Sequence, residues 1–205
     1  TTLYADSTFS KYVWAGVNGN HDNMTRQNAQ SNDFFRNVNN NPMNGYAGEI
    51  GVSYYFIYGN ALFVMLNNEA MKSEEGLTKA QDWMKAVIKN NPAKYVIAVS
   101  HYQWFMGEDG RSSQYNRWKT FFDAYGVDLA ISGNNHIYVR TNALFADKET
   151  DGSKGTVYLQ TPSSDNERGR SFGEQLYNKD LIKFRWSEGS NNVGALTMKA
   201  NKKNL

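Results

Sequence analysis

Between residues 74 and 141 the chain alternates segments of helical periodicity with short runs of β-forming residues. Apolar residues recur every three or four positions along Glu74–Asn90 and again along Tyr115–Tyr125, which predicts two amphipathic helices. The runs Tyr95–Val99 and Asp128–Ser132 predict strands before and after the second helix. Because parallel strands need a crossover connection that is usually helical, this alternation predicts a layered α/β fold.

Hairpins on either side of this segment predict a mixed sheet. Gly59-Asn60 accepts positive φ and joins Ser53–Tyr58 to Ala61–Leu66, which is the clearest hairpin in the sequence. The other predicted strands are Tyr12–Val17, Ile137–Thr141, Thr156–Gln160, Leu181–Trp186 and Gly194–Met198. The stretches Asn37–Asn44 and Asp147–Lys154 are expected to be loops.

Composition limits the domain organisation, the classes of partner and the kinds of metal site. The chain has 205 residues, of which 40% are hydrophobic, so we expect one folded domain over residues 1–198 and a tail over 199–205. Its 22 basic and 20 acidic residues leave a net charge of +2, which gives no nucleic-acid or membrane signal. The absence of Cys excludes thiolate metal sites. Abundant Asn, Lys and Tyr favour a secreted or cell-surface bacterial protein, and a cytoplasmic location stays open.

Three histidines follow predicted strands, and the chain has no others. His21 follows Tyr12–Val17 at a short distance, His101 directly follows the strand from Tyr95, and His136 lies just beyond Ser132. Layered α/β proteins build their sites at the carboxyl ends of strands, so we expect the three imidazoles to converge there. The alternative is that each histidine caps a strand or satisfies a hydrogen bond in the core.

Imidazole and amide ligands without thiolate suit zinc, manganese, iron or a nickel-like ion. Calcium would require several carboxylates, and these strand ends supply few. In the pair Asn20-His21 the amide oxygen can bind an ion while the imidazole stays free to move a proton. The sequence therefore predicts a transition-metal site with an acid or base beside it.

Three ordered motifs carry a family resemblance over about residues 12–165. Gly19–Asp22 reads GNHD, Val99–His101 reads VSH, and Gly133–Arg140 reads GNNHIYVR. Together they resemble the calcineurin-like metallophosphoesterases, in particular the branch similar to purple acid phosphatases. The resemblance implies a four-layer α/β sandwich of two mixed β-sheets flanked by helices.

The resemblance also implies a reaction and a set of site residues. The reaction is hydrolysis of small phosphate mono- or diesters with two divalent or trivalent ions of iron, zinc or manganese. The implied metal ligands are Asn20, Asn134, His101 and His136, the implied catalytic acid is His21, and Tyr102 and Arg140 are candidates for substrate contact. For Arg140 the alternative is a surface guanidinium stacked on Tyr138.

Two departures from the family pattern qualify these expectations. Asn134 stands where the family has the first histidine of its last motif, and an amide is a poorer ligand than imidazole. The two aspartate motifs that precede GNH in the family do not occur before Asn20, and Asp6 does not match them. We therefore expect a C-terminal portion whose first strands are missing, with partial or no metal occupancy and no activity by itself.

The missing strands predict an exposed sheet edge, which the missing N-terminal segment or a second copy of the chain would cover.

One alternative to an enzyme remains open. The chain would then be a non-catalytic binding or surface module that keeps a degenerate metallophosphoesterase scaffold.

Overall fold

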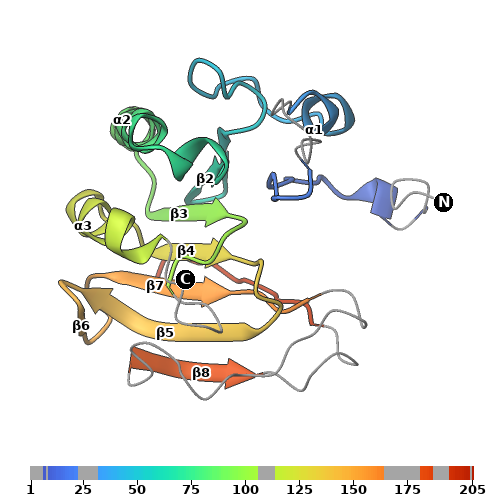
Figure 1. Cartoon of the computed structure of the whole chain (residues 1–205). Helices are drawn as coiled ribbons and strands as arrows, with labels where there is room; N and C mark the ends of the chain where they lie inside the picture. The colour runs from blue at the N-terminus through green and yellow to red at the C-terminus, as the bar shows by residue number, and fades with distance from the viewer. Residues whose placement is uncertain are drawn as a thin grey trace.

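The structure is a computed structural model that describes residues 7, 9–22, 32–105, 114–163, 181–186, 194–203 and 205. Within these residues eight strands form one mixed sheet in the order β1-β2-β3-β4-β7-β5-β6, with β8 also paired to β5 (Figure 1). The strands are β1 (Tyr54–Tyr58), β2 (Ala61–Leu66), β3 (Tyr95–Ser100), β4 (Leu129–Ser132), β5 (Tyr138–Phe145), β6 (Lys148–Glu149), β7 (Thr156–Gln160) and β8 (Ile182–Trp186). The helices are α1 (Asp33–Val38), α2 (Glu74–Asn90) and α3 (Tyr115–Tyr125), with 3-10 turns η2 (Phe9–Lys11) and η3 (Ala70–Lys72).

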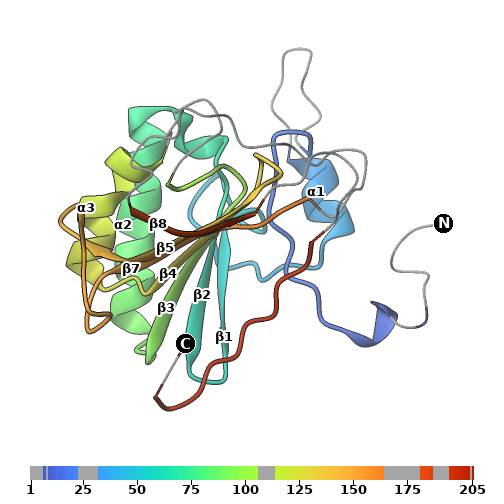
Figure 2. The ribbon, with the colours of Figure 1, turned by 90° about the horizontal axis from the view of Figure 1, so that it is seen from below.

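The middle of the sheet is parallel, as the helix–strand alternation predicts. Strands β2, β3, β4 and β7 run parallel, whereas β1 and β5 pair antiparallel to their neighbours. Helix α2 connects β2 to β3 and α3 connects β3 to β4, and Figure 2 shows both helices on the same face of the sheet. The mixed α/β class is confirmed. The second sheet that the family resemblance implies is not among the described residues.

The parallel strands end at one level, which fixes the place of the site. β2 and β3 end their pairing together at Leu66 and Ser100, and β4 and β7 also end together. One residue further, the backbone N–H of Gly133 donates to the carbonyl of His101 at 2.9 Å. The residues that follow β2, β3, β4 and β7 therefore share one edge of the sheet.

The main core lies between the sheet and helices α2 and α3. Leu77, Ala80, Met84 and Val87 form the buried face of α2, as its periodicity predicts. Aromatic rings dominate the space under α3, where Trp104 contacts Trp118 and Phe122 edge-on. The largest fully buried side chains are Trp104, Trp118, Tyr54, Tyr158, Phe122, Leu62, Leu66, Met71, Met84, Ile97 and Ile137.

The opposite face of the sheet carries a smaller apolar cluster. It consists of Ala61, Tyr95, Ile97 and Leu129, with Phe63, Val99, Ile131, Val157 and Leu159 partly buried around them. The segment 194–203 runs along this side of the molecule (Figure 2), from a backbone bond between Gly194 and Ser163 to the carbonyl of Asn201. That carbonyl accepts hydrogen bonds from Asn60 Nδ2 and Tyr95 Oη.

Two predicted strands are wrong. Neither Tyr12–Val17 nor Gly194–Met198 forms a strand, because neither segment joins a ladder of backbone hydrogen bonds among the described residues, and β-propensity alone does not make a strand. The expected loop Asp147–Lys154 contains the two-residue strand β6, and α1 enters the expected loop Asn37–Asn44 as far as Val38.

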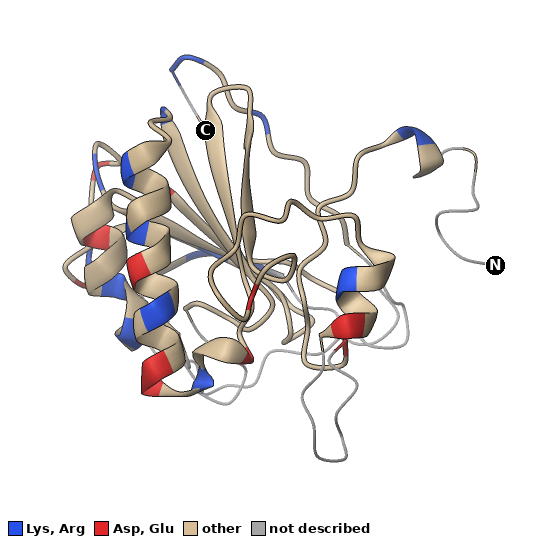
Figure 3. Ribbon diagram, turned by 90° about the horizontal axis from the view of Figure 1, so that it is seen from above, with Lys and Arg blue, Asp and Glu red and all other residues tan. Residues whose placement is uncertain are grey.

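Charged side chains are interspersed along the helices that cover the sheet. Figure 3 shows Lys, Arg, Asp and Glu of both signs on α2 and α3, which is typical of a solvated helix face. Among the helices that the structure describes, none combines the length and the apolar character needed to cross a bilayer.

Gly76 lies inside the first turn of α2, where helix propensity alone would favour alanine. Its N–H donates to the capping hydroxyl of Ser73 at 3.0 Å, and a Cβ added at this position would lie 1.7 Å from the carbonyl oxygen of Ala70. Alanine is the better helix former by about 1 kcal/mol. We nevertheless expect Gly76→Ala to lower the free energy of unfolding by about 1–3 kcal/mol, because the backbone of η3 must move away.

Urea denaturation followed by circular dichroism measures this difference. Thr78→Ala is the matched control, because it changes an exposed position of the same helix and should alter the free energy of unfolding by no more than about 0.5 kcal/mol. A Gly76→Ala variant as stable as the parent would contradict the close approach of η3.

Candidate metal centre and adjacent polar pocket

A tight turn brings the GNHD motif against the end of β3. The N–H of Gly19 donates to Asp22 Oδ2 at 2.8 Å, and the N–H of Asp22 donates to the Gly19 carbonyl at 3.2 Å. A Cβ on Gly19 would lie 3.3 Å from the ring of His101. Glycine at this position therefore allows the backbone of the turn to approach the imidazole closely.

Asn20 and His101 face each other through their ligand atoms. Asn20 Oδ1 lies 2.9 Å from His101 Nε2. This is a hydrogen-bond distance. Two ligands of one tetrahedral zinc ion, each about 2.1 Å from the metal, are separated by roughly 3.4 Å, so a small outward shift of the two side chains would make room for an ion.

The other two histidines lie in the electrostatic neighbourhood of His101. Burial lowers the pKa of His101 below its usual range, and the charges of His21 and His136 act in the same direction. The carboxylates of Asp22 and Glu69 oppose this shift. The three imidazoles therefore lie within electrostatic range of one another, although the described residues form no metal-binding group of three His, Cys, Asp or Glu side chains. The lowered pKa favours the neutral form of His101, which is the form that binds metal.

The turn after β4 holds two residues in a strained conformation. Asn134 has φ 69° and His136 has φ 61°, a left-handed region that non-glycine residues adopt only at a cost of about 1–3 kcal/mol. The amide of Asn134 donates from Nδ2 to Gln103 Oε1 at 2.9 Å. This bond directs the amide nitrogen to Gln103, which lies two residues after His101.

The two candidate substrate contacts have different surroundings. Tyr102 lies beside His101, donates from its hydroxyl to Glu69 Oε1 at 2.8 Å and from its N–H to Asn68 Oδ1 at 2.6 Å. Burial and the charge of Glu69 raise the pKa of Tyr102. Arg140 is exposed on β5, with its guanidinium 4.3 Å from the ring centroid of Phe184. Arg140 thus stacks on an aromatic ring of β8.

Sequence reasoning missed a set of polar residues at the same edge. They are Asn18, Asn67, Asn68, Glu69 and Gln103, all at least nine-tenths buried. Among the described atoms, Asn18 Oδ1 and Asn68 Nδ2 are buried without a hydrogen-bond partner. The signal was present, since Asn67, Asn68 and Glu69 directly follow the buried strand β2, just as the histidine at position 101 follows β3.

The described donors fit one ion better than two. Asn20 and His101 supply neutral ligands, and no group of three His, Cys, Asp or Glu side chains with metal-binding geometry occurs in the described part of the chain. The nearby carboxylates are bonded elsewhere: Asp22 to the Gly19 N–H, and Glu69 to Tyr102 and Lys72. Two adjacent cations require carboxylates to offset their charge, and the described residues do not provide them.

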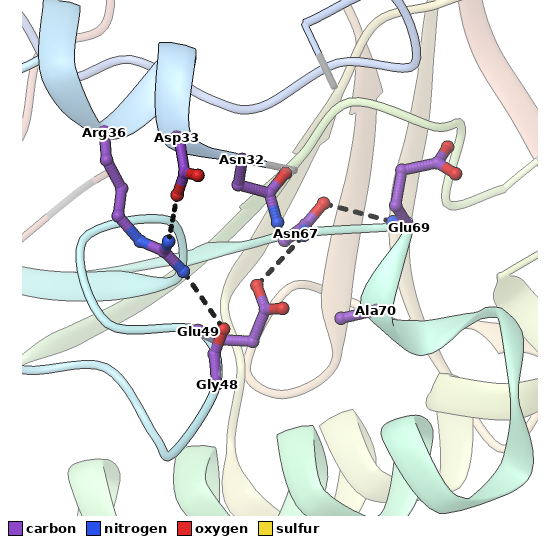
Figure 4. A pocket seen from close by; sticks show the side chains of 8 residues that line it. All are labelled: Asn32, Asp33, Arg36, Gly48, Glu49, Asn67, Glu69 and Ala70. Atoms are coloured by element: carbon purple, nitrogen blue, oxygen red, sulfur yellow. Dashed lines mark hydrogen bonds and ion pairs between the residues drawn. The ribbon is translucent and has the colours of Figure 1, made fainter. Parts of the chain in front are cut away.

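A polar pocket of about 370 Å³ lies next to this centre (Figure 4). Its lining consists of Asn32, Asp33, Arg36, Gly48, Glu49, Asn67, Glu69 and Ala70. Asn67 connects the pocket to the GNHD turn, because its Oδ1 accepts from Asn18 Nδ2 at 2.9 Å while its Nδ2 donates to Glu49 Oε2 at 2.9 Å. The pocket and the candidate metal centre therefore share a wall of buried amides.

The burial of Glu49, in the pocket wall, makes the stability of the folded state depend on pH and fixes the sign of that dependence. Burial raises the pKa of Glu49 above 4.5, against the lowering effects of the Asn67 bond and the Arg36 charge. The folded state therefore holds its proton more tightly than the unfolded chain, and it loses stability as pH rises through the raised pKa. We expect Glu49→Gln to gain stability relative to the parent between about pH 4 and pH 7.

Denaturation midpoints measured across this pH range test the expectation. Glu75→Gln is the control of opposite sign, since Lys79 lowers the pKa of the exposed Glu75. If the difference in stability between Glu49→Gln and the parent stays constant with pH, the claim that burial raises the pKa of Glu49 is wrong.

Comparison with other proteins places the fold and the motifs in one family. The calcineurin-like phosphoesterase family matches residues 4–138, which is more than half of the chain. Uncharacterized proteins Rv2577 and MT2654 of two Mycobacterium tuberculosis strains are 23% identical over 179 residues, covering 71% of this chain and 34% of their own length. The chain thus spans about a third of the length of these curated relatives.

A solved structure agrees at the level of fold. Purple acid phosphatase PPD1 from yellow lupin superposes with a TM-score of 0.50 at 16% identity, over 67% of this chain and 27% of that protein. At this identity the likeness is one of fold. The chain belongs to the calcineurin-like phosphoesterase family.

Proposed function

We propose that the protein containing this chain hydrolyses small phosphate mono- or diesters with bound transition-metal ions. The observation that carries the proposal is the pair of ligand atoms Asn20 Oδ1 and His101 Nε2, 2.9 Å apart, with His21 and His136 in their electrostatic neighbourhood. Family membership supports the same reaction class.

The residues of the chain take separate roles in this proposal. Asn20, His101 and His136 would hold an ion, and Asn134 would contribute through its amide oxygen. The bound ion would supply Lewis-acid chemistry to the attacking water and to the phosphoryl oxygens. His21 donates a proton to the leaving alcohol oxygen from its exposed position beside the centre. Tyr102 contacts the ester from the loop after β3.

The identity and number of the ions belong to the proposal as well. Two ions of iron, zinc or manganese require carboxylates beyond those that the described residues offer to the centre. We propose that a further part of the same protein, or a second copy, supplies them and covers the edge of the sheet. A secreted or cell-surface bacterial location stays a prediction.

One observation favours a non-catalytic alternative. Asn134 replaces the expected histidine, and its amide nitrogen is bonded to Gln103. A scaffold that lost this ligand and its carboxylates would keep the fold and serve as a binding or surface module.

Metal analysis combined with turnover distinguishes these two functions. The protein in its natural length is purified and its iron, zinc and manganese are quantified by mass spectrometry. Hydrolysis of p-nitrophenyl phosphate and of bis(p-nitrophenyl) phosphate is then measured with and without a chelator. Stoichiometric metal and chelator-sensitive turnover are expected; a protein without metal and without turnover would favour the binding module.

A further inference from the structure

The turn after β2 is bonded to the residue that follows His101. We propose that Asn68, in this turn, is a positioning residue for His101: it fixes the peptide group after the histidine and thereby keeps the imidazole directed at Asn20. The consequence for metal binding rests on the proposed function, whereas the position of the imidazole rests on the contacts of the chain alone.

One peptide group joins His101 to Tyr102, and both of its polar ends are bonded. Its N–H donates to Asn68 Oδ1 at 2.6 Å, and its carbonyl, which belongs to His101, accepts from the N–H of Gly133 at 2.9 Å. Asn68 follows β2 and Gly133 follows β4, the two strands that flank β3. Because a peptide group is planar, these two bonds fix its plane and restrict the backbone dihedral ψ of His101.

Asn68 is itself fixed by its neighbours in the chain. The N–H of Asn67 donates to Ser53 Oγ at 3.1 Å, and the N–H of Glu69 donates to Asn67 Oδ1 at 3.1 Å. The side chain of Asn68 is only 1% exposed. A buried side chain whose backbone is bonded on both sides can position another residue, because it has little freedom to move with it.

The same turn also binds the far end of Tyr102. Glu69 Oε1 accepts from the hydroxyl of Tyr102 at 2.8 Å, and Glu69 Oε2 accepts from Nζ of Lys72. Two adjacent residues after β2 therefore fix both the backbone and the side chain of Tyr102. The segment directly after His101 cannot shift without breaking bonds at both places.

The side chain of Asn68 allows a matched pair of variants. Its Oδ1 accepts from Tyr102, whereas its buried Nδ2 has no hydrogen-bond partner among the described atoms. Asn68→Asp keeps the acceptor oxygen and loses none of these bonds, and Asn68→Leu has a similar size but no acceptor. Asn41→Leu is the control, since Asn41 is also buried and its Nδ2 donates to a backbone carbonyl, that of Gly51.

Hydrogen exchange tests the bond to Asn68 without any metal. The protein in its natural length is freed of metal, and exchange at the Tyr102 amide is followed by mass spectrometry with fragmentation to single residues. We expect this amide to exchange about tenfold faster or more in Asn68→Leu, and at the parent rate in Asn68→Asp and Asn41→Leu. An unchanged rate in Asn68→Leu would overturn the proposal.

Metal binding tests the consequence for the centre. Partners that orient a metal-binding histidine contribute about 10–100-fold to affinity, so we expect Asn68→Leu to bind zinc at least tenfold more weakly in competition with a chromophoric chelator. The visible spectrum of the cobalt-substituted protein should change as well, because it reports the geometry of the ligands. Asn68→Asp should bind at least as tightly as the parent, and Asn41→Leu should keep the affinity and the spectrum of the parent.

The outcomes separate failure of this proposal from failure of the proposed function. Unchanged affinity and an unchanged cobalt spectrum in Asn68→Leu would reject the positioning role and keep the phosphoesterase. A parent protein that takes up no metal would reject the phosphoesterase, and crystal structures of the metal-free parent and Asn68→Leu would then decide the positioning role. An imidazole displaced from Asn20 in the variant supports that role, and an unmoved imidazole rejects it.

Discussion

Replacing His101 with alanine is expected to remove bound metal and to reduce phosphoester hydrolysis by more than about 100-fold, because partners that merely orient a metal-bound histidine already contribute about 10–100-fold. His101 is the residue that joins β3 to the centre, with its Nε2 facing Asn20 Oδ1 at 2.9 Å. Metal content by mass spectrometry and kcat/KM for p-nitrophenyl phosphate measure the two effects.

His21 provides the matched comparison for this variant. We expect His21→Ala to keep its metal and to lose about 10²–10⁴-fold in kcat, the usual contribution of a positioned acid. Tyr58→Ala, at the exposed tip of the β1–β2 hairpin, controls for unspecific effects and should change neither quantity. Full metal content and full activity in His101→Ala would remove the basis of the proposed centre, and metal loss in His21→Ala would mean that His21 is a ligand.

Replacing Trp104 with alanine is expected to lower the free energy of unfolding by about 3–5 kcal/mol, the range for large aromatic side chains in a core. Trp104 is fully buried, contacts Trp118 and Phe122, and donates from Nε1 to the carbonyl of Ile131 at 2.9 Å. A domain has about 5–15 kcal/mol of stability in total, so this change removes a large part of it. Guanidinium denaturation followed by fluorescence or circular dichroism measures the loss.

Two further variants separate packing from the hydrogen bond. Trp104→Phe keeps an aromatic ring and loses the bond to Ile131, so its loss should be smaller than that of the alanine variant. Trp14→Ala removes a tryptophan whose side chain is 42% exposed and should have a much smaller effect. Equal losses at positions 14 and 104 would contradict the aromatic core beneath α3.

The local sequence pattern predicts those helices and strands that are stabilised by one continuous apolar face. The periodicity of Glu74–Asn90 and Tyr115–Tyr125 gives both helices with their bounds, and Ala61–Leu66 is a strand over the same residues. The same kind of pattern fails for Tyr12–Val17, which has strong β-formers but no strand partner among the described residues. A helix closes its own hydrogen bonds, whereas a strand depends on a neighbour that its own sequence does not specify.

The candidate centre likewise has features that the sequence predicts and one that only the tertiary structure shows. The placement of His101 after a buried strand and of Asn20 in a glycine turn is readable from the sequence, because strand ends meet at one edge of a layered sheet. The 2.9 Å contact between their side chains is a fact of the tertiary structure, since 81 positions separate them.

The sequence alone determined helices α2 and α3, the hairpin and the family motifs, since each of these rests on short-range pattern or on adjacent residues, whereas it did not predict α1. Only the tertiary structure decided the polar pocket, because its walls come from α1, from the loop before β1 and from the end of β2. The bonds from Asn67 to Asn18 and Glu49 span 49 and 18 positions. Nothing in the local sequence of an asparagine or a glutamate specifies such partners, and the packing of the sheet brings them together.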